Sequence, residues 1–166
     1  MTTPIDCEIG YYCSGSNVYP TPCPIGTYGT LAGQDAVSDC KACDAQQYCD
    51  TVGQPAPADY CHAGFICSTG NSRPGPYVTV FGPPNQSGRC PVGYICRAGE
   101  AMYEFCPATT YQPAEQTDSC ESCPPGKYCT GGFFAMPCQS GYFCSKKSST
   151  PAPTLEQAAM GGICPV

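Results

Sequence analysis

The chain has 166 residues, of which 17 are cysteine, and its formal net charge is −6 although only 12% of its residues are charged. Its seven basic residues include one adjacent pair and no basic stripe, which argues against a nucleic-acid partner because phosphate contacts need clustered Lys and Arg. No apolar run approaches the roughly 20 residues of a membrane span, and the first residues lack the basic start and apolar stretch of a signal peptide.

The cysteine content predicts a disulfide-stabilised protein of an oxidising compartment, extracellular or at the cell surface. Leu, Ile, Val and Phe are too few to offset chain entropy by burial alone, with only two leucines in the chain. Disulfides supply the difference, each contributing about 2–4 kcal/mol. We therefore expect a string of small disulfide-linked modules, each with a tiny core, and not one large domain.

The cysteines repeat in order. The first set is Cys7, Cys13, Cys23, Cys40, Cys43, Cys49, Cys61 and Cys67, and the second is Cys90, Cys96, Cys106, Cys120, Cys123, Cys129, Cys138 and Cys144. The offset between matching members stays nearly constant through all eight positions, which chance spacing would not produce. Cys164 then begins a third set, so we expect the chain to be a window of a longer repeating protein. The predicted organisation is a first unit at 1–76, a linker at 77–89, a second unit at 90–144, a Ser/Thr/Pro linker at 145–163 and the start of a third unit at 164–166.

A smaller element, Cys-x-x-Gly-x-aromatic, recurs within each unit, as in Cys7-Glu-Ile-Gly-Tyr-Tyr-Cys13. Glycine at the fourth position permits the positive φ of a type II turn, and a short strand follows. The aromatic or aliphatic residue before the closing cysteine is placed to pack over a disulfide. Where Gln46 and Thr109 replace this glycine, we expect a different turn at the same place.

Two segments are poor in cysteine. Tyr77–Phe81 is predicted to form an edge strand, and residues 148–154 a polyproline-like linker. Thr154–Met160 is a candidate for one or two helical turns, begun by the Thr154 cap and ended by two glycines. Elsewhere the pattern predicts short β-hairpins and turns in an elongated rod with almost no helix.

Part of each unit resembles a known repeat. The stretches from Cys23 through Cys40 and Cys43 to Cys49, and from Cys106 through Cys120 and Cys123 to Cys129, resemble the ephrin-receptor-like cysteine-rich repeat. That module is related in appearance to tumour-necrosis-factor-receptor and epidermal-growth-factor-like (EGF-like) repeats. The resemblance implies a long extracellular protein, such as the mastigoneme-type surface fibre proteins, and brings no catalytic residues or cofactors.

Two Cys-x-x-Cys pairs, Cys40/Cys43 and Cys120/Cys123, have the spacing of zinc ligands or a redox couple. A zinc site needs four local ligands and the chain has one histidine, so structural disulfides are the favoured interpretation. Eight cysteines allow 105 pairings, and the sequence leaves these open. The resemblance implies Cys23–Cys40, with Cys43–Cys61 and Cys49–Cys67 interleaved, and the same order in the second unit.

No other residues form a recognisable site. His62 is interpreted as an ordinary exposed side chain, and no nucleophile has a matching base, so we expect no catalysis. Carboxylates are scattered over what we interpret as a solvated surface, for example Asp6, Glu8, Asp35, Asp39, Glu115 and Asp118. Asn85 is the acceptor of an N-glycosylation sequon. The candidates for O-glycosylation are Ser148, Ser149, Thr150 and Thr154.

Two functions fit these features. The favoured one is a structural extracellular repeat glycoprotein whose modules associate with neighbouring units or copies in a surface fibre. The alternative is a stalk or ligand-binding ectodomain of a receptor or adhesin, with exposed aromatic residues as contacts. Cys164 is expected to pair with a cysteine beyond Val166 or on another subunit.

Overall fold

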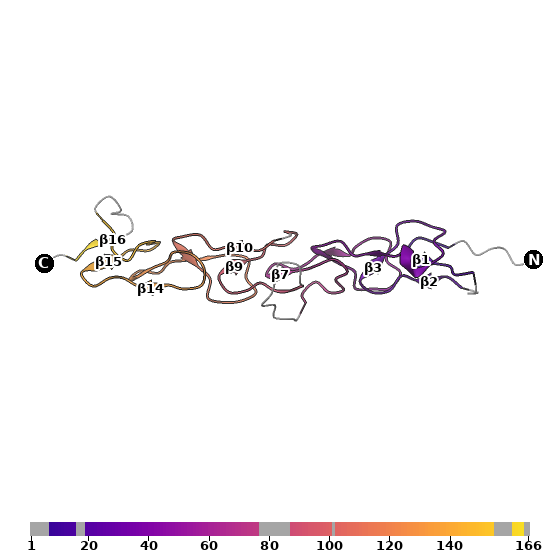
Figure 1. Cartoon of the computed structure of the whole chain (residues 1–166), viewed down its shortest axis with the longest axis horizontal. Helices are drawn as coiled ribbons and strands as arrows, with labels where there is room; N and C mark the ends of the chain where they lie inside the picture. The colour runs from indigo at the N-terminus through magenta and orange to yellow at the C-terminus, as the bar shows by residue number, and fades with distance from the viewer. Residues whose placement is uncertain (1–6, 16–18, 77–86, 101, 155–160, 165–166) are drawn as a thin grey trace, which may run out of the picture.

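The structure is a computed structural model that describes residues 7–15, 19–76, 87–100, 102–154 and 161–164. Within these residues the chain forms a tandem series of two-stranded antiparallel hairpins, stacked into an elongated rod with β1 and β2 near one end and β15 and β16 near the other (Figure 1). The predicted fold class, disulfide-rich hairpin modules in a rod with almost no helix, is confirmed.

Eight hairpins follow one another along the described residues. They are β1(Tyr11–Tyr12) with β2(Thr21–Pro22), β3(Thr27–Tyr28) with β4(Lys41–Ala42), β5(Gln47–Tyr48) with β6(Asp59–Tyr60), β7(Phe65–Ile66) with β8(Gly88–Arg89), β9(Tyr94–Ile95) with β10(Glu104–Phe105), β11(Thr110–Tyr111) with β12(Glu121–Ser122), β13(Lys127–Tyr128) with β14(Met136–Pro137), and β15(Tyr142–Cys144) with β16(Gly161–Ile163). The described part of the chain adds a single 3₁₀ turn, η1(Val37–Asp39). Each hairpin is therefore the structural form of one Cys-x-x-Gly-x-aromatic element.

Each element begins at a cysteine, here called the opening cysteine, and its fourth residue is here called the turn residue. In the first element the Tyr11 N–H donates to the Glu8 carbonyl at 3.1 Å, and the turn residue Gly10 has a φ of +86°. This combination is that of a type II turn, in which the third of four residues needs positive φ. Glycine favours this turn because it reaches positive φ without a steric penalty.

Gln46 and Thr109 also adopt positive φ, 68° and 78°, so the expectation of a different turn at these positions is wrong. A left-handed conformation costs a residue with a Cβ roughly 1–2 kcal/mol. Two backbone hydrogen bonds oppose that cost at Thr109, whose N–H donates to Cys129 and whose carbonyl accepts from Cys123, both at 2.9 Å. At Gln46 the side-chain amide adds a third bond, to the Cys67 carbonyl at 3.0 Å. Position in the repeat therefore overrides residue type.

The turn residues also join successive hairpins. The carbonyl of each turn residue accepts a hydrogen bond from the next opening cysteine, over distances of 2.8–3.2 Å, from Cys23 N–H to Gly10 through Cys164 N–H to Gly141. The N–H of a turn residue also donates to a backbone carbonyl at the end of the first strand of the next hairpin. For example, the Gly26 N–H donates to the Cys49 carbonyl, which follows β5, at 2.8 Å. A ladder of backbone hydrogen bonds thus runs through the whole series.

The ladder crosses the boundary predicted at 77–89. β8 lies inside that segment and pairs with β7, with Phe65 opposite Arg89. Gly64, in the first unit, donates its N–H to the Cys96 carbonyl of the second unit at 2.7 Å and accepts from the Cys90 N–H at 2.8 Å. The described end of the segment, Gly88 and Arg89, is thus the return strand of a hairpin, and the predicted strand at 77–81 lies outside the described residues.

The described part of segment 145–163 also packs on the rod. Ser148 and Pro153 are fully buried, and the Ser148 carbonyl accepts the Cys129 N–H at 2.9 Å. β16, at the end of the segment, pairs with β15. Residues 155–160, which carry most of the predicted helical turn, lie outside the described residues.

The disulfides close the hairpins locally. They are Cys7–Cys13, Cys23–Cys40, Cys43–Cys49, Cys61–Cys67, Cys90–Cys96, Cys106–Cys120, Cys123–Cys129 and Cys138–Cys144. The pairing Cys23–Cys40 agrees with the expectation, whereas the interleaved Cys43–Cys61 and Cys49–Cys67 pairs are wrong. The reason is geometric: the type II turn reverses the chain and brings Cys43 and Cys49 to a Cα–Cα distance of 5.9 Å, within the range of a disulfide.

The disulfides also form the core. Among the described residues, the buried hydrophobic set consists of cysteines apart from Tyr28, Ile66 and Ile95. Tyr28 packs against Cys43 and Cys49, and Ile66 packs against Cys90 and Cys96. Tyr28 and Ile66 are each the last residue of the first strand of a hairpin. Each therefore covers the disulfide of the next hairpin, which couples neighbouring modules.

Candidate binding surfaces

The two Cys-x-x-Cys pairs do not form a joint site. Cys40 and Cys43 bond to Cys23 and Cys49, and Cys120 and Cys123 bond likewise to separate partners. No group of His, Cys, Asp and Glu suited to a metal ion is found in the described ranges. Both pairs are therefore structural.

The carboxylates predicted to be scattered have separate surroundings. Asp39 accepts the backbone N–H groups of Asp35 and Ala36 at 3.2 and 3.1 Å and so caps η1. Glu8 and Asp118 are exposed, Glu115 is half-buried, and Asp6 lies outside the described residues. None of these contacts indicates a function beyond local structure.

One carboxylate belongs to a small polar network on the third turn. Asp44 pairs with Lys41 at 2.8 Å and accepts a hydrogen bond from the Tyr28 hydroxyl at 2.9 Å. The hydrogen bond from Lys41 chiefly, and that from Tyr28, lower the pKa of Asp44. The contact of Lys41 with Asp44 chiefly, and its contact with Tyr28, raise the pKa of Lys41. The network fixes Tyr28 over its disulfide.

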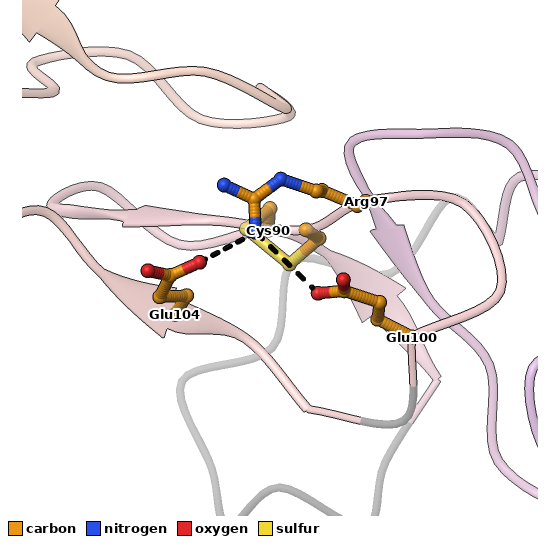
Figure 2. Close-up of polar contacts among 5 residues, drawn as sticks. Cys90, Arg97, Glu100 and Glu104 are labelled. Carbon is orange, nitrogen blue, oxygen red and sulfur yellow. Dashed lines mark hydrogen bonds and ion pairs between the residues drawn. A yellow bond between two sulfur atoms is a disulfide. The ribbon is translucent and has the colours of Figure 1, made fainter.

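A second ion-pair group lies on hairpin β9–β10. The Arg97 guanidinium is 2.6 Å from Glu104 and 3.7 Å from Glu100, between the two carboxylates (Figure 2). Glu104, chiefly, raises the pKa of Arg97. All three side chains are about half exposed, so the group contributes little to stability and is best described as a solvated surface pair.

Aromatic side chains, three of them exposed and two half-buried, gather around the same hairpin. Tyr94 contacts Tyr103 and Phe105 edge-on, with ring centroids 4.7 and 5.2 Å apart. Phe133 and Phe134 lie nearby, with ring centroids 4.0 Å apart and ring planes tilted by 46°. A Cβ on Gly132 would lie 2.7 Å from the Phe105 ring, so that ring lies directly against the loop before Phe133. Phe105 and Phe134 remain 50% and 61% exposed. We call these five aromatic residues the aromatic face.

His62 is exposed, and it lines a cavity of about 420 Å³ where the two predicted units meet. Phe65 and Arg73 of the first unit, Arg89 of β8 and Gln116 of the second unit contribute further walls. Sequence reasoning did not find this cavity, because its residues are far apart in the chain: most come from the β7–β8 hairpin and its long loop, and Gln116 comes from the β11–β12 loop. The sequence did contain one signal: Arg73 and Arg89 correspond, one repeat later, to the neutral residues Thr150 and Ile163.

The glycosylation candidates have different outcomes. Ser148 is fully buried and donates its hydroxyl to the Thr150 carbonyl at 3.1 Å, so its hydroxyl is not accessible from solvent in the folded chain. Ser149 and Thr150 are half-buried and Thr154 is exposed. Asn85 lies outside the described residues. Cys164 is exposed and unpaired among the described residues, and its N–H is bonded like those of the opening cysteines from Cys23 onward.

Comparison with known proteins adds one similarity. No protein-family model matches the chain. Over 69 residues the chain is 36% identical to Sushi, von Willebrand factor type A, EGF and pentraxin domain-containing protein 1 of Rattus norvegicus. The aligned stretch is 42% of this chain and 2% of that protein, so the chain spans only a small part of the relative's length.

The similarity and the structure agree on a coarse description. This is a cysteine-rich repeat segment that resembles part of a large extracellular multidomain protein. Its eight disulfides in tandem short modules are consistent with EGF-like repeats, which are typically non-catalytic. The disulfides and the similarity together suggest an extracellular location. No helix within the described residues is long and apolar enough to cross a membrane.

Proposed function

We propose that the chain is a stiff, elongated spacer segment of an extracellular structural glycoprotein that forms or joins a surface fibre. The observation that carries the proposal is the backbone ladder, which links each turn residue to the following hairpin from Gly10 to Cys164. Modules that contact chiefly their neighbours build quasi-one-dimensional assemblies. A ladder without a break at the junction of the units favours a rod that resists bending there.

The accessible surface supports the same proposal. The chain exposes 9776 Å², whereas a globular protein of its 17.4 kDa mass exposes about 7,900 Å². The excess of roughly a quarter is what a thin, extended shape requires. With so little burial, the disulfides take the place of a hydrophobic core in maintaining this shape.

Small-angle X-ray scattering of the oxidised chain tests the rod. A globular chain of this length has a radius of gyration of about 15 Å, and we expect a value well above it. A radius of gyration that matches the globular value contradicts the proposal. The fibre role needs electron microscopy of the native, full-length material, in which we expect filaments with a repeat along their axis; dispersed single molecules contradict that role.

The aromatic face favours a second candidate, a ligand-binding or stalk ectodomain. Exposed aromatic residues are enriched at the energetic centres of protein interfaces. The test is chemical crosslinking of the protein in its native cell-surface setting. The unchanged chain is compared with Phe134→Ser, which removes the most exposed ring of the aromatic face. The ectodomain role predicts a crosslinked protein partner that the variant loses, whereas Val52→Ser, at a similarly exposed residue in another hairpin, retains it. Crosslinks that join only copies of this chain favour the fibre.

A further inference from the structure

The cavity between the two units gathers positive charge in an acidic protein. The chain has three arginines, and two of them, Arg73 and Arg89, line this cavity beside His62. No Asp or Glu is among the lining residues. Arg97, outside the cavity, is paired with two glutamates, whereas neither cavity arginine has a carboxylate within ion-pair distance among the described residues. The cavity is therefore an uncompensated cationic site.

One donor in the cavity is also unsatisfied. The Arg89 Nε is buried and has no hydrogen-bond partner in the described part of the chain. A buried donor without a partner is costly, and a guanidinium donor more so because it is charged. Arg89 stands directly opposite Phe65 in the β7–β8 pair, and the Phe65 ring also lines the cavity. The Arg89 guanidinium is thus held by its strand next to an apolar wall.

The matching residues one repeat later show that the hairpin fold does not require these charges. His62 donates its N–H to the Pro74 carbonyl, and Gln139 donates to the Pro151 carbonyl in the same way. Arg89 pairs with Phe65, and Ile163 pairs with Tyr142 in the same register. Counting from these anchors, Arg73 corresponds to Thr150. At the positions of His62, Arg73 and Arg89 the next repeat therefore has Gln, Thr and Ile, and the same backbone contacts form. The three side chains of this cavity are thus not needed for the hairpin fold.

We propose that this cavity binds a small organic oxyanion, a carboxylate- or sulfate-bearing molecule about the size of one sugar ring. The guanidinium group presents a fork of donors that matches such anions, and a bound oxyanion would satisfy Arg89 Nε. A volume of about 420 Å³ is in the range of small-molecule sites, and Phe65 offers an apolar surface for the body of the ligand. The net charge of −6 disfavours a long polyanion, which the rest of the surface would repel.

The test is titration of the oxidised chain with glucuronate, glucose 6-sulfate and neutral glucose, followed by NMR of the three arginine Nε–H signals. We expect the Arg89 and Arg73 signals to shift with at least one of the anionic sugars, and none to shift with glucose. The Arg97 signal is the internal control. A response to glucuronate alone assigns a carboxylate ligand, and a response to the sulfate alone assigns a sulfate ligand.

Variants taken from the second unit complete the test. Arg89→Ile and Arg73→Thr should each weaken binding about tenfold or more, the loss of one charged hydrogen bond. Arg97→Gln removes the same charge elsewhere and should leave the affinity unchanged. Should Arg89→Ile fold poorly, the exposed Arg73 keeps the test valid. Equal binding of glucose, equal weakening by Arg97→Gln, or no Arg89 shift at about 10 mM of either anionic sugar overturns the proposal.

Discussion

Gly64→Ala should destabilise the chain far more than Gly126→Ala, although both glycines are turn residues with φ near +80°. A Cβ on Gly64 would lie 2.6 Å from the carbonyl oxygen of Gln116, closer than a real Cβ approaches backbone. A Cβ on Gly126 meets nothing within 4 Å. The pair therefore separates the cost of φ from the cost of a clash.

The magnitudes follow from these two terms. Positive φ costs alanine roughly 1–2 kcal/mol in either variant. Overpacking against backbone adds about 1–3 kcal/mol at Gly64 only. We thus expect a loss of about 1–2 kcal/mol for Gly126→Ala and about 2–5 kcal/mol for Gly64→Ala. Thr109, a natural turn residue at φ 78°, shows that the first term alone is tolerated.

The assay is guanidinium unfolding of the oxidised variants, together with amide hydrogen exchange. Because Gly64 bonds to Cys90 and Cys96 across the junction, its variant should also speed exchange of the Cys90 amide and leave Cys23 unchanged. Equal destabilisation by the two substitutions, or unchanged exchange at Cys90, would refute the role of close backbone contact in joining the units.

Three further predictions use other parts of the structure. In Cys43→Ser, non-reducing peptide mapping should find Cys49 as the new free thiol, because the two pair within one turn; a free Cys61 contradicts the local pairing. The contribution of Asp44 to stability should be complete above about pH 4 and lost as the pH falls through its lowered folded-state pKa, since a depressed carboxyl pKa stabilises the ionised form. NMR titration should show that Lys41→Met moves this pKa back up, and an unchanged value refutes the assigned cause. Finally, an O-glycosylating enzyme should modify Thr154 in preference to Ser148, which is buried, as site mapping by mass spectrometry can show; a glycan on Ser148 of the folded chain contradicts its burial.

The sequence predicts the hairpin repeat well, because the spacing of cysteine, turn glycine and aromatic residue is itself the local structure. It failed where partners lie far apart in the chain. β8 consists only of Gly88 and Arg89, so no pattern marks it as the return strand of a hairpin.

The disulfide pairing failed for a different reason. The resemblance to a known repeat suggested interleaved bonds, whereas the turn at Gln46 brings Cys43 and Cys49 to a Cα–Cα distance of 5.9 Å. The cavity was missed because Arg73 and Arg89 are well separated in the sequence and form no basic run. Their proximity depends on the pairing of β7 with β8.

The joint between hairpins is independent of what the loops contain. Successive opening cysteines are closely spaced from Cys123 to Cys138 and much more widely spaced from Cys61 to Cys90, yet the same amide-to-carbonyl bond forms at each step. Insertions and substitutions in the loops therefore leave the backbone hydrogen bonds between successive hairpins nearly unaffected. Such a chain is free to diversify in evolution one hairpin at a time, acquiring a charged cavity in one unit and an aromatic face in another while its spine stays constant.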